Sequence, residues 1–310
     1  MSKQEQSTPL VEQVKKELAD SGLSQQKAAQ EIGISQASFS QWVGGKYANP
    51  AAIEAKVARW LESRQQRADI EAQLPVAPGY LRLPSALRIE AGLVYAQMAS
   101  DIAVIYGGAG CGKTMAARIY REQHPNVWIA TMTPSTCTLG PCLERVAIAT
   151  GLRPATMRAS RIEADLVDRL EGTHGLVIVD EAQHLHARSI EAIRSLHDAT
   201  GVGVALMGNE SVYARITGGS RAAEFAQLFS RIGKRVRLTR PSKADVKALL
   251  SAWGVGDDAE IVTASIEIAA RPGALRGLTK TLRLASLFAA GQPLSITHLR
   301  AAWDDLGEDR

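Results

Sequence analysis

The octet Gly107 to Thr114, GGAGCGKT, places a lysine and a hydroxyl directly after a run rich in glycine. It matches G-x-x-x-x-G-K-[ST], in which glycines let backbone N–H groups curl around phosphate oxygens. Lys113 would then reach the terminal phosphates, and the Thr114 hydroxyl would ligate Mg²⁺. We therefore expect a site for ATP and Mg²⁺, with the nucleotide held by Gly107, Gly108, Ala109, Gly110, Cys111, Gly112, Lys113 and Thr114.

Two further polar groups each follow an apolar run of the buried-strand kind. Asp180 and Glu181 follow the run 176–179, and Asn209 follows the run 202–207. Asp180 is expected to hold Mg²⁺, and Glu181 to orient or deprotonate the attacking water. Asn209 could position the same water, although Gly-Asn is also a common plain turn. The catalytic interpretation is favoured because the glycine-rich octet, Asp180-Glu181 and Asn209 each follow a predicted strand in the same way.

Three arginines are candidates for the phosphates. Arg276 lies in Pro-Gly-Ala-Leu-Arg at the start of a predicted helix, and is expected either to reach the γ-phosphate or to be structural. Arg231 and Arg235, in FSRIGKR, are expected where a helix ends before the last strand. Either could act as an arginine finger on a neighbouring subunit, which would make hydrolysis depend on oligomerisation.

The elements that must position these groups form an α/β pattern. Apolar runs predict strands at 102–106, 127–130, 176–179, 202–207 and 236–238, and a helix is expected from 114 to 122. Buried runs separated by helices are typical of a parallel sheet. After Pro241 the pattern becomes helical, with caps at Ser242 and Ser295, which predicts a small helical lid.

The first 64 residues predict a separate, all-helical domain. Ser24 is a good N-cap for a helix from 25 to 32, Gly33 supplies a turn, and a second helix is expected from 35 to 43. Its Phe39 and Trp42 would pack back on the first helix. This arrangement resembles the helix-turn-helix of phage-repressor-like proteins.

The exposed face of that second helix is expected to contact DNA. Its candidates are Gln36, Ser38, Gln41 and Lys46, with Ser35 and Tyr47 beside them. A bundle that docks protein is the alternative, because the local charge is nearly neutral. Prolines and a glycine between 65 and 84 predict an extended linker. The expected domains are therefore 1–64, a linker at 65–84, a core at 85–240 and a lid at 241–310.

Composition excludes several classes of protein. The chain has 310 residues, of which 45% are hydrophobic and 22% charged, as expected for a folded soluble protein. No apolar run approaches the length of a membrane span, and the start lacks a signal-peptide core, so a cytoplasmic location without membrane contact is expected. Three cysteines are too few for a disulfide framework.

The stretch 215–240 is strongly basic. It holds six arginines and one lysine against a single acidic residue, Glu224, which makes it a plausible contact for a polyanion.

The nucleotide motifs resemble those of AAA+ P-loop ATPases, with Asn209 at the place of sensor 1 and Arg276 at that of sensor 2. Longer strings resemble the Mu B family of phage transposition proteins. They are WLE at 60–62, NVW at 126–128, TPS at 133–135, LEGTHGLVIVDEAQHL, LMGN, TGG near Thr217, EFAQLFSRIGKR, KADVKA and RPGALR.

This resemblance implies an ATPase that assembles as a helical filament on double-stranded DNA, with little sequence preference. Such a protein delivers the DNA to a transposase and stimulates it, and transposase contact promotes ATP hydrolysis. By position, Lys113, Thr114, Asp180, Glu181, Asn209, Arg231 and Arg276 would serve the nucleotide. Arg153, Arg158 and Arg161 would contact DNA, although this segment is less densely basic than the family pattern.

Two other functions remain open. One is a sequence-specific DNA-binding regulator in which the ATPase senses nucleotide, and the other is a loader of a replicative helicase.

Overall fold

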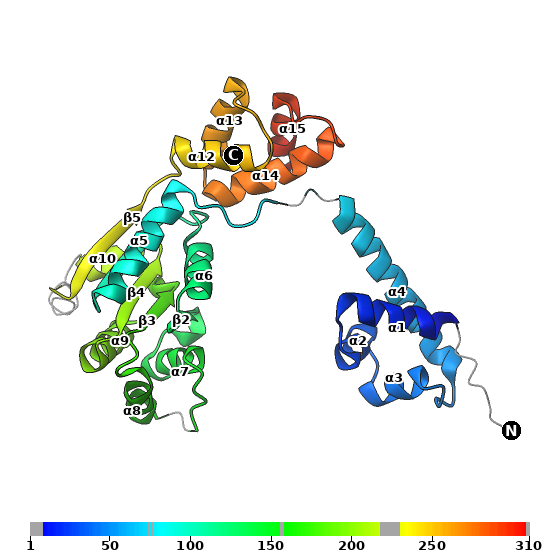
Figure 1. The fold of residues 1–310 in the computed structure, drawn as a ribbon, viewed down its shortest axis with the longest axis horizontal. Coiled ribbons are helices and arrows are strands. Elements are labelled where there is room, and N and C mark those ends of the chain that lie inside the picture. Colours follow the sequence, from blue (N-terminus) through cyan, green and yellow to red (C-terminus); the bar gives the residue numbers. More distant parts are fainter. Residues whose placement is uncertain (1–8, 74, 76, 156–157, 218–229, 308–310) are drawn as a thin grey trace. The chain divides into compact units, whose positions relative to one another are not determined.

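The computed structural model of the chain describes residues 9–73, 75, 77–155, 158–217 and 230–307. It forms two compact units, residues 1–75 and 76–310, which are described one at a time (Figure 1). Among the described residues, no helix is both long and apolar enough to span a bilayer.

The described part of the first unit contains four helices: α1 (Pro9–Ser21), α2 (Gln25–Ile32), α3 (Gln36–Val43) and α4 (Pro50–Gln73). The Ser24 and Ser35 hydroxyls accept hydrogen bonds from the first-turn amides of α2 and α3. Gly33 ends α2 in the left-handed region, at a φ of 75°, where a glycine carries little strain. Phe39 and Trp42 are buried in the core between the helices. The predicted helix-turn-helix is therefore present with its expected cap at Ser24, and Ser35 caps its second helix.

Helix α4 departs from the prediction at its end. It continues to Gln73, so the first part of the segment expected as an extended linker is helical. The physical reason is composition, because 65–73 consists mainly of Gln, Arg, Ala and Glu, which are good helix formers. The first helix-breaking residue in this segment is Pro75.

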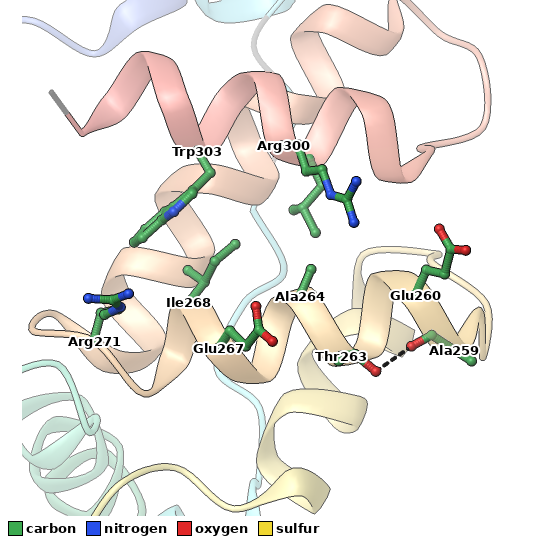
Figure 2. Close-up of a pocket in the computed structure, with 10 residues that line it drawn as sticks. Ala259, Glu260, Thr263, Ala264, Glu267, Ile268, Arg271, Arg300 and Trp303 are labelled. Carbon is green, nitrogen blue, oxygen red and sulfur yellow. Dashed lines mark hydrogen bonds between the residues drawn. The ribbon is translucent and has the colours of Figure 1, made fainter. Parts of the chain in front are cut away.

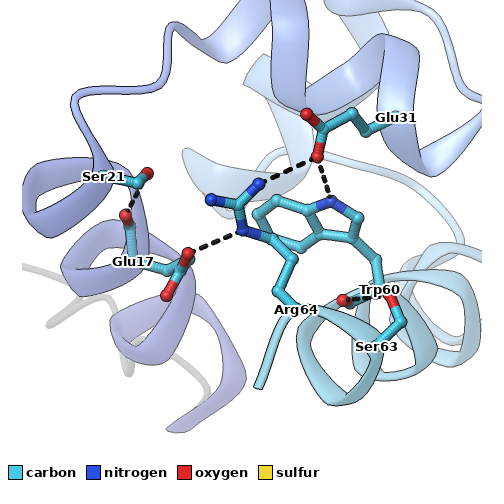
Figure 3. Close-up of polar contacts among 6 residues, drawn as sticks. All are labelled: Glu17, Ser21, Glu31, Trp60, Ser63 and Arg64. Carbon is cyan, nitrogen blue, oxygen red and sulfur yellow. Dashed lines mark hydrogen bonds and ion pairs between the residues drawn. The ribbon is translucent and has the colours of Figure 1, made fainter. Parts of the chain in front are cut away.

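A polar cluster joins α1, α2 and α4 in this unit (Figure 3). The guanidinium of Arg64 donates to Glu17 at 2.6 Å and to Glu31 at 3.1 Å, and it lies over the Trp60 ring. The Trp60 indole N–H donates to the same Glu31 carboxylate at 2.9 Å. These contacts make Glu31 the shared acceptor for two side chains of α4.

The second unit contains a five-stranded sheet in the order β2-β3-β4-β1-β5, with every recorded pairing parallel. The strands are β1 (Ile102–Gly107), β2 (Val127–Thr131), β3 (Leu176–Asp180), β4 (Gly203–Gly208) and β5 (Ile232–Leu238). All five predicted strands are present, and the parallel sheet is confirmed. Because the strands are parallel, their carboxyl ends lie along one edge, which we call the phosphate edge.

Helices cover both faces of this sheet. Side chains alternate along β1, so Ile102 and Val104 pack on one face while Ala103 and Ile105 pack on the other. The first face packs against α7 (Leu139–Ala149), α8 (Ala159–Leu170), α9 (Ala187–Thr200) and α10 (Glu210–Thr217). The second packs against α5 (Pro84–Met98) and α6 (Lys113–Gln123). Two short 3₁₀ helices are η1 (Pro134–Thr136) and η2 (Ala182–His184).

The predicted helical lid is present as α12 (Lys243–Ala252), α13 (Ala259–Ala269), α14 (Ala274–Ala289) and α15 (Ile296–Leu306). Ser242 and Ser295 both form the expected caps. The buried Asp245 accepts from the Ser85 amide at 2.8 Å, which joins the lid to the start of α5.

A groove lies in the lid between α13 and α15 (Figure 2). Its lining combines Trp303 with two carboxylates, Glu260 and Glu267, and two guanidiniums, Arg271 and Arg300. Because the walls carry both signs of charge, the groove lacks the single-sign surface that a nucleic-acid backbone favours.

Candidate nucleotide site

The glycine-rich loop follows β1 at the phosphate edge, and α6 begins within it at Lys113. A Cβ on Gly107 would lie 2.0 Å from the Leu238 carbonyl oxygen, and one on Gly110 would lie 2.0 Å from that of Gly273. Both glycines also have positive φ angles, 155° and 83°. No larger residue fits either position, and the loop leads into the N-terminus of α6, where backbone N–H groups favour anions.

Lys113 is held against this loop. Its Nζ donates to the carbonyl oxygens of Gly107 and Gly108, both at 2.9 Å. Burial lowers the pKa of the Lys113 ammonium, while the negative charges of Asp180 and Glu181 act in the opposite direction. An ammonium has three donors, so its position beside the loop is suited to phosphate oxygens.

Thr114 and Asp180 are in direct contact. The Thr114 hydroxyl donates to Asp180 Oδ2 at 2.7 Å, and the Glu181 amide donates to Asp180 Oδ1 at 3.0 Å. Asp180 is only 1% exposed, and burial raises the pKa of its carboxyl although both hydrogen bonds favour the charged form. A hydroxyl and a carboxylate are the oxygen donors that Mg²⁺ prefers, so these residues fit the expected ion.

Glu181 and Asn209 are linked through Gln183, a residue that the sequence analysis missed. Gln183 Nε2 donates to Glu181 Oε2, and Gln183 Oε1 accepts from the backbone amide of Asn209 at 3.2 Å. Asn209 Oδ1 accepts from the Ser211 amide and hydroxyl at 2.9 and 2.6 Å. The signal for Gln183 in the sequence is an amide side chain two positions after Glu181, within the same short turn.

Arg276 lies in the first turn of α14, beside the loop. A Cβ on Gly110 would lie 3.4 Å from Arg276 Cβ, and the positive charge of Arg276 contributes to the lowered pKa of Lys113. The lid thus brings an exposed arginine to the phosphate edge, at the place expected from the sequence.

Arg231 lies at the amino ends of the strands, opposite the phosphate edge. It directly precedes β5, whose Ile232 pairs with Ile102 at the start of β1, whereas Leu238 pairs with Gly107. A strand of this length spans about 20 Å, so Arg231 is too far away to serve the loop of its own subunit. It is 55% exposed and contacts Asp198 at 3.2 Å.

The placement of Arg235 differs from the expectation. It lies within β5, not at a helix end before that strand, because β5 begins at Ile232. The apolar run used for the prediction, 236–238, covers only the end of the strand. The earlier part, Ile-Gly-Lys-Arg, has polar residues in an edge strand, where one side of the backbone remains unpaired.

The candidate DNA contacts lie on two separate surfaces. Arg153 and Arg158 are exposed between α7 and α8, and Arg161 is exposed on α8, where it pairs with Asp165 at 3.0 Å.

In the first unit, Gln36, Gln41 and Lys46 are exposed, whereas Ser38 is half-buried with its Oγ 2.8 Å from Ser35 Oγ. Tyr47 is half-buried because it packs partly against the helical core, so it is less exposed beside α3 than expected.

The basic stretch 215–240 is only partly covered by the described residues. Arg221 and Glu224 lie outside the described residues, as do most of the TGG string and the segment EFAQLF.

The chain is similar to known families, curated proteins and solved structures. Its residues 230–306 match the family described as Mu B transposition protein, C terminal, and residues 97–216 match an AAA domain. It is 39% identical over 284 residues to the ATP-dependent target DNA activator B of Escherichia phage Mu, which covers 91% of this chain and 89% of the relative. It is 34% identical over 274 residues to the Mu-like prophage FluMu DNA transposition protein B of Haemophilus influenzae, covering 88% and 94%.

Solved structures support the fold. A Walker-type ATPase of Pyrococcus abyssi is 13% identical with a TM-score of 0.50, over 74% of this chain and 72% of that one. Together with the AAA domain match and the parallel sheet, this likeness confirms an AAA+ P-loop fold with a helical lid, preceded by a helical region.

Proposed function

Because this chain belongs to the family of Mu B transposition proteins, we propose that it is a Mg²⁺-dependent ATPase that acts on target DNA in transposition. The relative from Escherichia phage Mu is named an ATP-dependent target DNA activator, which motivates both parts of the proposal. The single observation that carries it is the convergence of Lys113, Thr114, Asp180 and Arg276 on one glycine-rich loop.

The residues of the phosphate edge have distinct roles in this proposal. The loop amides and Lys113 bind the phosphates, and Arg276 contacts the γ-phosphate from the lid. Thr114 and Asp180 hold Mg²⁺, which when bound neutralises charge on the phosphate oxygens.

Two further groups of this edge act on the attacking water. Glu181 orients the water and accepts its proton. Asn209 offers the Nδ2 group of its amide to the same water, because its oxygen is engaged with Ser211.

Hydrolysis in this proposal needs a second subunit. Arg231 lies at the edge of the sheet opposite its own loop, so it can supply charge only to the site of a neighbouring protomer. We therefore propose a homo-oligomer, a helical filament on double-stranded DNA, in which the subunit contact completes the site. Arg235 is the less suitable finger because it lies within β5.

DNA contact in this proposal is mainly electrostatic. Arg153, Arg158 and Arg161 contact phosphates from the ATPase core, and Gln36, Ser38, Gln41 and Lys46 contribute from the first unit. Contacts of this type carry little sequence information and weaken as salt rises. The filament delivers the DNA to a transposase and stimulates it, in the cytoplasm. The proposed core and lid remain 85–240 and 241–310, whereas the first domain extends beyond residue 64 to the end of α4 at Gln73, which shortens the proposed linker.

The first experiment is a fluorescence-anisotropy titration of random-sequence duplex DNA. It is run with a slowly hydrolysed ATP analogue, with ADP and without nucleotide, and repeated for Lys113→Ala. We expect cooperative DNA binding only with the analogue. We expect none for Lys113→Ala, because this variant lacks the ammonium group that binds the nucleotide phosphates.

Two results would count against the proposal. Binding that ignores nucleotide would contradict it. A discrete protected site on genomic fragments would favour a nucleotide-sensing regulator, which the ordered helix-turn-helix of the first unit also fits.

A further inference from the structure

Gln183 occupies a central place among the polar groups of the phosphate edge. It lies on η2, two positions after Glu181. Its side-chain amide contacts both Glu181 and Asn209, the first residue after β4. Its Nε2 donates to the Glu181 carboxylate, while its Oε1 accepts from the backbone amide of Asn209. One side chain therefore connects the ends of two neighbouring strands, β3 and β4.

The end of β4 is shaped around this amide. A Cβ on Gly208 would lie 2.3 Å from Gln183 Oε1 and 2.6 Å from a methyl carbon of Val212, so a side chain there would displace Gln183. The two contacts also need a donor and an acceptor on one planar group. Glutamine provides both, whereas a glutamate of the same size provides only acceptors when ionised.

Glu181 needs such a restraint. Its backbone is in the left-handed region, at a φ of 56°, which costs a non-glycine residue free energy and sets the direction of its side chain. The side chain is only half-buried. Gln183 engages one carboxylate oxygen, Oε2, and so restricts rotation while the other oxygen remains available for a water.

Asn209, the other end of this link, is itself well fixed. Its side chain caps α10 through Ser211. The Tyr213 ring of the same helix stacks on Tyr106 of β1, with 4.5 Å between the ring centres. The amide of Gln183 is therefore anchored to a residue that has further contacts with α10.

We infer that Gln183 is a positioning residue for ATP hydrolysis, which holds the Glu181 carboxylate at a fixed place relative to Asn209. This inference rests on the proposed function, because it assigns Glu181 and Asn209 to the attacking water. Gln183 does not touch the nucleotide in this assignment and acts only through Glu181. Its loss should therefore slow the chemical step without weakening ATP binding.

The test is steady-state and single-turnover ATP hydrolysis by the full-length chain with DNA, for the wild type, Gln183→Ala and Gln183→Glu. Gln183→Glu keeps the size of the side chain and loses the donor, so it separates positioning from packing. We expect both variants to lower kcat roughly 10- to 100-fold, the range that a misplacement of about 1 Å can cost. KM and binding of the ATP analogue should stay at wild-type values, and the melting temperature should fall only by the small amount that two lost hydrogen bonds cost. The matched control is Gln292→Ala, an exposed glutamine after α14.

A double variant sharpens the test. In a Glu181→Gln background, Gln183→Ala should have no further effect on the residual single-turnover rate, because the residue it positions is already gone. An additive loss would falsify the inference, as would wild-type or raised kcat in Gln183→Ala. A wild-type chain that hydrolyses no ATP would instead overturn the proposed function and, with it, this inference.

Discussion

The phosphate edge of the sheet and the first helical unit use polar side chains in opposite ways. At the phosphate edge, the side chains proposed for chemistry are themselves part of the contact network: Asp180 is 1% exposed and receives two hydrogen bonds. In the first unit, Gln36, Gln41 and Lys46 are exposed, and the polar cluster that joins α1, α2 and α4 is made by other residues, around Arg64. The proposed reactive geometry is thus fixed by its own members, whereas most of the proposed DNA-contacting side chains stand on a scaffold that other residues stabilise.

The largest expected effect tests the first half of this comparison. Thr114→Val keeps the shape of the side chain but leaves the buried Asp180 without its 2.7 Å hydrogen bond and removes one proposed Mg²⁺ ligand. Because the proposed Mg²⁺ site loses one of its oxygen ligands, ATP hydrolysis should fall at least ~10- to 100-fold, the loss typical when a supporting group of a metal site is removed. Thr263→Val on α13 is the control, because its hydroxyl bonds only a backbone carbonyl of the lid. Wild-type hydrolysis by Thr114→Val would show that the contact is dispensable.

The second prediction concerns the contact between the loop and the lid. Gly110→Ala places a Cβ within 2.0 Å of the Gly273 carbonyl oxygen, so the start of α14, and Arg276 with it, must move away from the loop. We expect the affinity for ATP to fall about tenfold and the melting temperature to drop.

Gly291→Ala is a matched control for that experiment. Gly291 also has a positive φ, 85°, but an added Cβ would have no neighbour within 4 Å. It should therefore show only the backbone strain, about 1–2 kcal/mol. Equal effects of the two variants on ATP affinity, measured by isothermal titration calorimetry, would contradict the proposed role of the contact.

The comparison also explains what could be predicted from the sequence. The loop, Asp180 and the Ser24 cap were all identified from local sequence features. Ser24 caps a helix that begins at the next residue, and Asp180 ends an apolar strand run whose carboxyl end shares the phosphate edge with the loop. The same holds for the parallel sheet, whose strands are short apolar runs.

What the sequence analysis missed depends on contacts between distant parts of the chain. Arg64 contacts Glu17 and Glu31 from another helix, and the amide of Gln183 joins two strand ends. Tyr47 is a similar case, because only the packed core shows that its ring is partly buried. The bounds of β5 were missed for a different reason: an edge strand tolerates polar residues, so hydrophobic periodicity identifies only its end.

The third prediction tests the scaffold of the first unit. Trp60→Phe removes the indole N–H that donates to Glu31 at 2.9 Å. The expected loss in the free energy of unfolding of this unit is about 1 kcal/mol, at the lower end for a charged acceptor because Glu31 is partly exposed. ATP hydrolysis without DNA should not change. Calorimetric unfolding and an ATPase assay check the two parts, and a loss of hydrolysis would contradict the separation of roles.

The acidic side of the pH profile provides a second readout for that variant. The Trp60 hydrogen bond, with help from Arg64, lowers the pKa of Glu31 below its ordinary value of 4.5, against the effect of burial. A lowered folded-state pKa means that the stabilisation is present above pH 4.5 and is lost as the pH falls through the folded-state pKa. Trp60→Phe should therefore flatten the fall in melting temperature of the first unit below pH 4.5.

The smallest effect is expected on the exposed surface. Lys46→Ala should leave the melting temperature and ATP hydrolysis unchanged, because its side chain is exposed beyond α3. If the ammonium contacts a DNA phosphate, the slope of log Kd against log salt should fall by about 0.9, the value for one released counterion. Lys56→Ala, an exposed lysine on α4, is the control. Anisotropy titrations at several salt concentrations measure the slope. Equal slopes for the two variants would remove Lys46 from the DNA contact and favour protein docking by the first unit.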